Sequence, residues 1–434
     1  MTTPRILAIM GSGETAPTMT KVHRALFERM GPGPVPAVML DTPFGFQANA
    51  DELTERTTAY FKESVDRAMG VASLRRASEA DALDLERVRL QIREARLVFA
   101  GPGSPSYALR QWAGGPVPTE LADKLRSGGC VTFSSAAALT LGVATVPVYA
   151  VYKVGADPEW LPGLDLTAAT GLSLAVVPHY DNAEGGTHDT RFCYLGEGRL
   201  RALEADLGPE TFVLGVDEHT AAIFDLDAGT MEVLGRGGVT VRAAGRSEVV
   251  ATGSTVTISH LGEIAAALRE GREAAPDAGA ALGALATPTD ESAGGSRSLS
   301  ESVTVLEADF DGALSRRDAP GAVRIALSLE AALHEWAADT LQSDEADRGR
   351  AVLRGMIVRL GDAAEGGVRD PKIVFGPWVD ALLSLRAAAR RDKRWSDADV
   401  VRDQLIALGV EVRDGAGGTE WDLRPAGAQA LPVP

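Results

Sequence analysis

Residues 128–142 carry the strongest fold signal of the chain, in the order Gly128-Gly129-Cys130-Val131-Thr132-Phe133-Ser134-Ser135-Ala136-Ala137-Ala138-Leu139-Thr140-Leu141-Gly142. A short apolar run passes here into a serine that opens an alanine-rich helical segment. A strand that turns sharply into a helix at a serine forms a nucleophile elbow, in which the hydroxyl stands clear of the sheet. The competing interpretation is a buried strand followed by an ordinary core helix.

The usual elbow pattern is Gly-x-Ser-x-Gly, because Cβ atoms on either side of the serine crowd the turn. In the register centred on Ser135, the glycine positions hold Phe133 and Ala137. We therefore expect Ser135 at strained φ and ψ beside a bulky ring, at a cost of ~1–3 kcal/mol. A misplaced oxyanion donor would lower the rate by about 10²–10³. Ser134 is the alternative nucleophile, but it puts the following alanines out of phase with the helix.

Apolar runs alternate with helix-favouring segments through the first hundred residues. Strands are expected at 5–10, 35–40 and 97–100, and helices at 19–30, 51–69 and 79–95. This alternation predicts an α/β domain with a mostly parallel sheet and flanking helices. Ligands gather at the carboxyl ends of the strands in such sheets. The loops after Met10, Leu40, Ala100 and Phe133 should therefore share one crevice.

The loop after Ala100 begins Gly101-Pro102-Gly103-Ser104. Two glycines around a proline let the backbone approach a ligand and present an N–H group to it. In the functional interpretation, this loop supplies one oxyanion donor and the N–H of Ala136 supplies the other. The alternative is an ordinary turn before a helix capped by a serine.

A base and a carboxylate for the serine are found further along the chain. An apolar strand leads to His179 in a glycine-rich loop, and histidine is the side chain whose ordinary pKa suits a general base near neutral pH. A surface or capping histidine is the alternative. Asp217 and Glu218 follow another apolar run, and in extended backbone only one of them can face His179. We expect serine, histidine and carboxylate to meet at the rim of one sheet.

A metal site is a second interpretation of the same residues. Zinc or manganese could use ligands from His179, Asp181, His188, Asp189, Glu218 and His219. No His-x-His or His-x-x-x-His spacing fixes the geometry, so we predict no metal.

Residues 1 to about 260 resemble the dipeptidase E and cyanophycinase family of serine peptidases, which has a class I glutamine amidotransferase-like fold. The resemblance is carried by Ser135-Ala136-Ala137-Ala138 with Gly142, Gly101-Pro102-Gly103-Ser104, Pro178-His179-Tyr180 with His188 and Arg191, and Gly215 to Ala221. It implies a triad of Ser135, His179 and Glu218 and an oxyanion hole at Gly103 and Ala136. For substrate binding we carry over Ser104, Tyr107, Asp181 and Arg191. No cofactor is expected.

The composition changes after a helix expected at 262–274. Residues 275–300 are rich in Ala, Gly and Ser and read as a flexible linker. Helical periodicity returns from Val303, in a helical pair broken near Pro320. Further helices are expected at 351–360, 377–391 and 396–408, and a hairpin at 410–423.

Residues 303–424 resemble the C-terminal helical domain of cysteinyl-tRNA synthetase. The carrying residues are Arg386, Arg390, Lys393, Trp395, Ala398-Asp399, Arg402-Asp403, Leu405, Gly409-Val410, Asp414, Gly418-Thr419 and Trp421. The nucleotide-binding signatures of that enzyme have no counterpart, so amino-acid activation is not expected. The resemblance implies docking of tRNA or an aminoacylated conjugate through Arg386, Arg390, Arg391, Lys393 and Arg394. A helical bundle used for assembly is the alternative.

Length and composition set the frame for these assignments. The chain has 434 residues, two cysteines and a formal net charge of −17. We predict a serine-peptidase-like domain at 1–265, a helix end and linker at 266–302, and a helical domain at 303–426. The cysteine count suits a reducing cytoplasm. No apolar run approaches the ~20 residues of a membrane span, and the acidity disfavours strong non-specific binding to nucleic acid.

Two functional hypotheses follow. The first is a cytoplasmic serine hydrolase that cleaves a small peptide or isopeptide through Ser135, His179 and Glu218. The second is a catalytically silent protein that keeps both folds and binds a partner such as tRNA or an aminoacylated conjugate. A homo-oligomer is compatible with either.

Overall fold

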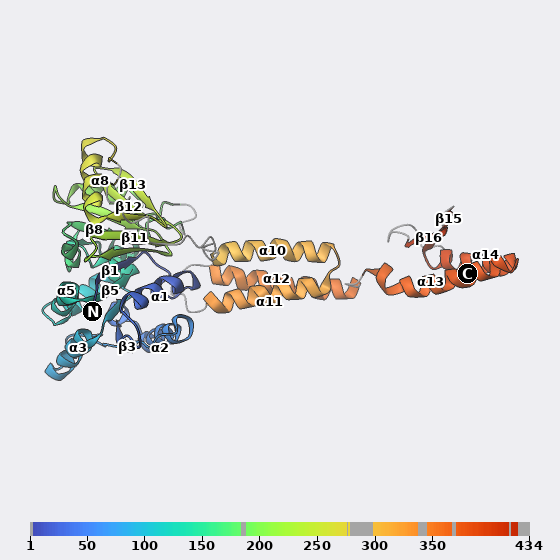
Figure 1. Ribbon diagram of the computed structural model, residues 1–434, viewed down its shortest axis with the longest axis horizontal. Helices are drawn as coiled ribbons and strands as arrows, with labels where there is room; N and C mark the ends of the chain where they lie inside the picture. Colours follow the sequence, from blue (N-terminus) through green and yellow to red (C-terminus); the bar gives the residue numbers. More distant parts are fainter. Residues whose placement is uncertain are drawn as a thin grey trace. The chain divides into compact units, whose positions relative to one another are not determined.

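The computed structural model describes residues 3–183, 188–275, 277, 298–336, 345–366, 370–415 and 418–423. The chain divides into two compact units, one formed by residues 1–298 with 334–346 and the other by residues 299–333 with 347–434 (Figure 1). Most of the linker expected at 266–302 lies outside the described residues. The domain boundaries expected from the sequence stay a prediction.

The first unit is built on an eight-stranded sheet of order β14-β11-β10-β1-β5-β4-β2-β3. Five strands run parallel, namely β1 (Arg5–Met10), β2 (Ala37–Leu40), β3 (Gly70–Val71), β4 (Leu97–Ala100) and β5 (Gly129–Ser134). Three antiparallel strands extend the sheet beyond β1, namely β10 (Thr220–Asp225), β11 (Thr230–Gly235) and β14 (Thr255–Thr257). The α/β class predicted from the alternating pattern is confirmed.

Alternation along β1 explains why helices cover both faces of this sheet. Leu7 and Ile9 belong to one core with residues of α3 (Ala82–Glu94), α4 (Pro105–Trp112) and α5 (Val117–Ser127). Ile6 and Ala8 belong to a second core with residues of α1 (Thr20–Arg29), α2 (Ala50–Tyr60) and the π-helical turn Phe61–Val65. Successive side chains point to opposite faces, so one apolar strand serves two cores.

A second sheet of six strands, which the sequence reasoning did not anticipate, has the order β13-β12-β9-β8-β6-β7. Its strands are β6 (Ala144–Thr145), β7 (Leu161–Pro162), β8 (Leu174–Val177), β9 (Phe212–Val216), β12 (Gly238–Ala243) and β13 (Arg246–Ala251). Helices α6 (Ser135–Leu139), α7 (Gly196–Ala205) and α8 (Ile258–Glu270) complete the unit, with short helical turns at Pro17–Met19, Thr42–Phe44, Ala150–Val154 and Leu166–Thr170.

The expectation that serine, histidine and carboxylate meet at the rim of one sheet is wrong. Ser135 follows β5 of the first sheet, whereas His179 and Glu218 follow β8 and β9 of the second. Strand β1 pairs with β5 on one side and with β10 on the other. The first sheet therefore has no free edge at β1 for β8 and β9 to join.

The second unit contains the helices and the hairpin that periodicity predicted. Its elements are α10 (Leu299–Ser315), α11 (Ala319–Glu335), α12 (Glu345–Gly366), α13 (Pro371–Arg391), α14 (Trp395–Ala407), β15 (Val410–Gly415) and β16 (Gly418–Leu423). The break expected near Pro320 lies at Asp318, whose carboxylate accepts the N–H of Gly321 at 2.9 Å. The helix expected from Pro377 begins earlier, at Pro371, because the side chain of Asp370 caps it through the N–H of Lys372 at 2.9 Å.

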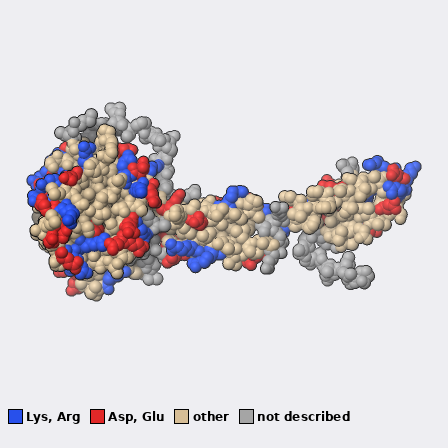
Figure 2. All heavy atoms as spheres, turned by 90° about the horizontal axis from the view of Figure 1, so that it is seen from below, with Lys and Arg blue, Asp and Glu red and all other residues tan. Residues whose placement is uncertain are grey.

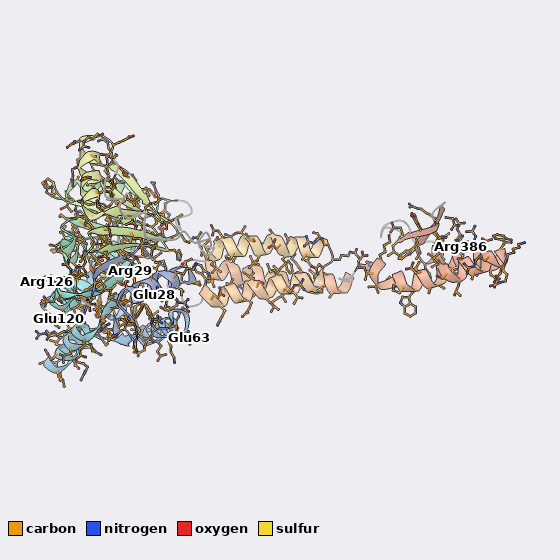
Figure 3. The ribbon with its side chains drawn as sticks, viewed as in Figure 1. Glu28, Arg29, Glu63, Glu120, Arg126 and Arg386 are labelled. Atoms are coloured by element: carbon orange, nitrogen blue, oxygen red, sulfur yellow. The ribbon has the colours of Figure 1, made fainter. Side chains whose placement is uncertain are left out.

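Helices α13 and α14 and the hairpin share a small core of Val379, Leu405, Val410 and Val412. Arg386 closes this core, since its guanidinium donates to both carboxylate oxygens of Asp414 at 2.8 and 2.7 Å (Figure 3). A bidentate pair of this kind fixes the angle between helix and hairpin. None of the helices in the described ranges has the length and apolar composition of a membrane span.

Acidic and basic side chains are interspersed over the face of the first unit that Figure 2 shows. The formal charge of −17 is therefore not collected in one patch on that face.

Helix α1 carries a fully buried titratable side chain, His23, on the face that packs against the core. His23 is surrounded by the rings of Phe61, Phe99 and Tyr60, at centroid distances of 4.8, 5.8 and 6.0 Å. Its Nε2–H donates to the carbonyl of Glu14 at 2.7 Å.

We predict that His23 makes the first unit sensitive to acid. Burial lowers the pKa of His23 from 6.5 to about 4, against the hydrogen bond to Glu14, which raises it. As pH falls below 6.5, His23 becomes protonated in the unfolded chain, whereas in the folded chain it stays neutral until about pH 4. The contribution of neutral His23 to the free energy of unfolding is therefore fully present above pH 6.5. It is lost as pH falls towards 4, which lowers the free energy of unfolding by about 3 kcal/mol.

Urea unfolding of the wild type and of His23→Gln at pH 7.5 and pH 4.5 measures this contribution. The glutamine variant should lose markedly less stability between the two pH values than the wild type does. Equal losses in the two proteins would show that His23 does not contribute.

Candidate active site

Ser135 occupies the turn between β5 and α6 with φ of 51°, in the left-handed region that non-glycine residues rarely adopt. The strain expected at a nucleophile elbow is therefore present at this serine. The hydroxyl of Ser134 is buried and donates to Oε2 of Glu14 at 2.8 Å. The neighbouring serine thus holds the loop after β1, and Ser135 alone of the two lines the cavity described below.

Phe133 and Ala137, which replace the usual glycines, do not crowd Ser135. The ring of Phe133 is fully buried in the core and lies 5.9 Å from the ring of Trp112, between centroids. Ala137 is also fully buried, and its N–H donates to the carbonyl of Gly101 at 3.2 Å. The phenyl ring is accommodated because the strand directs it into the core beside α4.

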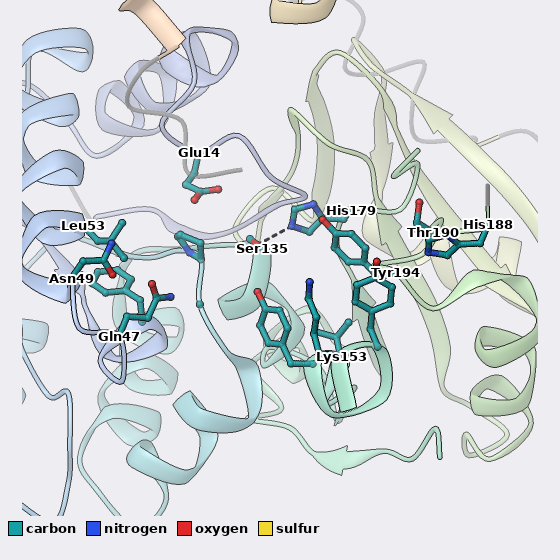
Figure 4. A pocket seen from close by; sticks show the side chains of 16 residues that line it. Glu14, Gln47, Asn49, Leu53, Ser135, Lys153, His179, His188, Thr190 and Tyr194 are labelled. Carbon is teal, nitrogen blue, oxygen red and sulfur yellow. Dashed lines mark hydrogen bonds between the residues drawn. The ribbon is translucent and has the colours of Figure 1, made fainter. Parts of the chain in front are cut away.

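Ser135, His179 and Glu218 form a continuous chain of hydrogen bonds. The hydroxyl of Ser135 lies 2.8 Å from Nε2 of His179 (Figure 4). On the other side of the ring, Nδ1 of His179 lies 2.8 Å from Oε1 of Glu218. A carboxylate can only accept, so Nδ1–H donates to Glu218 and Nε2 is left to accept the proton of Ser135.

Glu218 is suited to hold a charged imidazole. Burial raises its pKa, but the hydrogen bonds with His179 and Asn182 and the charge of His179 outweigh burial and leave the pKa below its ordinary value. The side-chain amide of Asn182 donates to the same oxygen at 3.2 Å. Asp181 fixes the backbone, since its carboxylate accepts the N–H of Glu218 at 2.7 Å.

Asp217 faces away from His179, as the opposite directions of neighbouring side chains require. Its carboxyl accepts the N–H of Gly238 at 2.7 Å. Burial, together with the charge of Asp181, raises the pKa of Asp217 to about 6. The choice that the sequence left open between the two carboxylates thus falls on Glu218.

The loop after β4 reaches the cavity through Gly103, which lines it together with Ser135. Gly103 has φ of 137°, and a Cβ built there would lie 2.1 Å from the carbonyl oxygen of Pro43. Only glycine fits this position. Ala136 is the first residue after Ser135 in α6, where the backbone N–H groups of a helix have no partner within the helix.

None of the four residues expected to bind substrate appears in the lining of the cavity, and each of them has other contacts. Ser104 caps α4 by accepting the N–H of Tyr107 at 3.3 Å, and the hydroxyl of Tyr107 donates to the carbonyl of Arg75 at 2.7 Å. Arg191 pairs with both carboxylate oxygens of Asp189 at 2.9 Å. Asp181, the fourth, supports Glu218 and is likewise outside the lining.

The cavity has a volume of about 380 Å³. The loops after β1, β2, β4 and β5 all contribute to it, which confirms the shared crevice expected from the sequence. Its lining comprises Glu14, Phe44, Gln47, Asn49, Leu53, Pro102, Gly103, Ser135, Val148, Tyr149, Tyr152, Lys153, His179, His188, Thr190 and Tyr194.

Sequence reasoning missed the wall formed by Tyr149, Tyr152, Lys153 and Tyr194. The first three lie at or in the π-helical turn Ala150–Val154, which no sequence motif marks. Glu14 could have been predicted from the sequence, because it lies in the loop after Met10 and that loop was expected to line the crevice.

The side chains named for a metal site do not form a ligand cluster in the part of the chain that the structure describes. No cluster of three or more His, Cys, Asp or Glu side chains there could hold an ion. Cys130 and Cys193 are buried and unbridged, and burial raises the pKa of each thiol to about 12.

Comparisons with known proteins match the two ends of the chain to different proteins. Residues 375–421 match the family described as the cysteinyl-tRNA ligase anticodon binding domain. A cysteine–tRNA ligase of Pseudomonas fluorescens SBW25 is 56% identical over 45 residues, 10% of each chain. One of Methylocella silvestris is 37% identical over 89 residues, 20% of each chain. The chain thus spans only a tenth to a fifth of the length of these relatives.

Among solved structures, a peptidase from an acI-B1 Actinobacterium has a TM-score of 0.47 and 18% identity, over 58% of this chain and 97% of its own. A putative peptidase E protein from Listeria monocytogenes EGD-e has a TM-score of 0.34 and 12% identity, over 57% and 98%. Both resemblances stated from the sequence thus have counterparts among known proteins. The likeness to the two solved structures is too distant to bear on activity.

We predict that Gly103→Ala disrupts the loop after β4. The added methyl group meets the backbone of Pro43 and a φ of 137° disfavours any side chain, so unfolding free energy should fall by at least ~2 kcal/mol. Gly114→Ala is the matched control, because Gly114 has φ of 70° and open space around it. Thermal unfolding compares the two variants, and equal losses would contradict the close approach at Gly103.

Proposed function

We propose that the first unit is a serine-type hydrolase that cleaves a small peptide or isopeptide. The observation that carries this proposal is the hydrogen-bonded order Ser135, His179, Glu218, with 2.8 Å at both contacts and the serine at a strained turn. Ser135 is the nucleophile, His179 the general base and Glu218 the group that orients the imidazole.

The arrangement supports acyl transfer in two steps. His179 takes the proton of Ser135 as its oxygen attacks the carbonyl carbon, and then gives that proton to the leaving nitrogen. Water, activated by the same imidazole, hydrolyses the acyl-enzyme and frees Ser135. The low pKa of Glu218 keeps it ionised, so it stabilises the imidazolium in both steps. We assign the oxyanion donors to the N–H groups of Gly103 and Ala136.

A fluorophosphonate probe tests the proposal. The full chain should be labelled at Ser135, and Ser135→Ala should abolish labelling. Glu218→Gln should lower the labelling rate by about 10²–10⁴, because the imidazole loses its orienting carboxylate. Asp217→Asn is the matched control, since this neighbouring carboxyl faces Gly238, and its rate should stay within a few-fold of wild type.

Absence of labelling at high probe concentration would support the silent binding protein instead. Equal effects of Glu218→Gln and Asp217→Asn would contradict the role assigned to Glu218.

We also propose that residues 375–421 bind tRNA, because this segment matches an anticodon binding domain. The structure changes which residues are available for this role. Arg386 is buried and paired with Asp414, which also holds Arg390 at 3.0 Å. Expecting Arg386 to dock tRNA was therefore wrong, and its side chain stabilises the fold. Arg391 and Lys393 are exposed at the end of α13.

The double variant Arg391→Glu with Lys393→Glu should weaken tRNA binding at least tenfold and reduce its dependence on salt, because phosphate contacts release counterions. Arg87→Glu, an exposed change of the same sign on α3, is the control. Filter binding of tRNA by the full chain at several salt concentrations measures both effects. Equal affinities of the double variant and the control would contradict binding through this helix end.

A further inference from the structure

The walls of the cavity around Ser135 differ in chemistry. Glu14, a buried carboxyl side chain, lies on one wall (Figure 4). Tyr149, Tyr152, Tyr194 and Lys153 form another wall, together with His188. Ser135 and His179 stand between these groups, so a molecule held by both walls presents its middle to the nucleophile.

The aromatic wall is suited to a planar ring. The rings of Tyr152 and Tyr194 lie 4.9 Å apart, and the ring of Tyr152 stacks on that of His188 at 6.3 Å with 17° between the planes. The ammonium of Lys153 lies 5.1 Å from the centre of the Tyr152 ring. No carboxylate of the described residues forms an ion pair with Lys153. The wall therefore offers stacking surfaces and a cation side by side.

Stacked aromatic side chains beside a cation are what single-stranded nucleic acid requires, since bases stack and phosphates attract the charge. A carboxyl group on the other wall suits an α-ammonium group. One class of molecule combines these features around a reactive carbonyl, namely an amino acid esterified to the 3′-terminal ribose of tRNA. A short peptide has the ammonium group and the carbonyl, but neither the base nor the phosphate.

We propose that the site hydrolyses the ester of an aminoacyl-tRNA, and that residues 375–421 select the tRNA. This inference rests on the serine hydrolase and the tRNA-binding segment proposed above. Two weak contacts with one molecule raise its effective concentration at each site. The segment that matches an anticodon binding domain then holds the tRNA while the aminoacyl end of the same molecule reacts at Ser135.

The reaction balances without a cofactor. Oγ of Ser135 forms a bond to the ester carbonyl carbon, and the bond from that carbon to the ribose oxygen breaks. His179 passes the serine proton to the ribose oxygen, which leaves as a hydroxyl of the uncharged tRNA. Water then attacks the acyl-enzyme, gives one proton through His179 to Ser135 and releases the free amino acid. Glu14 holds the α-ammonium group, while Tyr152 and Lys153 hold the terminal base and phosphate.

The experiment measures release of radiolabelled cysteine from cysteinyl-tRNA by the full chain, with alanyl-tRNA as the comparison. Ser135-dependent release should exceed spontaneous hydrolysis, and kcat/KM for cysteinyl-tRNA should be at least tenfold higher than for alanyl-tRNA. Cysteine methyl ester, which lacks base and phosphate, serves as the small substrate.

Lys153→Met should lower the ratio of kcat/KM for cysteinyl-tRNA to that for the methyl ester at least tenfold. Lys62→Met, a loss of the same charge at an exposed position outside the cavity lining, should leave that ratio unchanged. Release no faster than the spontaneous rate, in a protein whose Ser135 is labelled by fluorophosphonate, would overturn this inference and leave the hydrolase intact. Absence of both labelling and release would overturn the two together. An unchanged ratio in Lys153→Met would overturn the assigned base and phosphate contacts.

Discussion

The hydrogen bond between Nδ1 of His179 and Glu218 is the contact on which the site depends. It selects the tautomer in which Nε2 can accept the serine proton, and it places a negative charge where the imidazolium would form. Both partners follow neighbouring parallel strands, with Val177 of β8 opposite Gly215 of β9. The register of the second sheet therefore sets this contact, and Asp181 and Asn182 fix the carboxylate from the adjoining loop.

The nucleophile Ser135 follows a strand of the first sheet, whereas His179 and Glu218 follow strands of the second. The distance between Ser135 and His179 therefore depends on how the two sheets pack together. Ser135 is held by the turn from β5 into α6, with Ser134 tied to Glu14 below and Ala137 tied to Gly101 beside it. Gly103 reaches the same cavity because its missing side chain lets the loop after β4 lie against Pro43. Backbone strain at Ser135 is thus supported by buried hydrogen bonds on both sides of the turn.

The sequence alone located four of the five parallel strands and the three residues of the hydrogen-bonded chain, because apolar runs mark the strands and polar loops follow them. It did not predict β3 (Gly70–Val71), a strand of two residues that follows a segment expected to be helical. It placed the three hydrogen-bonded residues at one sheet, since the antiparallel partner of β1 lies more than two hundred residues away and leaves no local signal. It also missed Tyr152 and Lys153, which reach the cavity through tertiary packing of a helical turn. Arg386 looked like a nucleic-acid contact because its salt bridge with Asp414 becomes visible only when the hairpin folds back on α13.

A crystal structure of the protein after reaction with a fluorophosphonate would show whether Ser135 is the nucleophile and which groups hold the oxyanion. We expect phosphorus bonded to Oγ of Ser135, a phosphoryl oxygen within hydrogen-bond distance of the N–H groups of Gly103 and Ala136, and the imidazole of His179 still hydrogen-bonded to Glu218. An adduct at another residue, or a phosphoryl oxygen turned away from both N–H groups, would contradict these assignments.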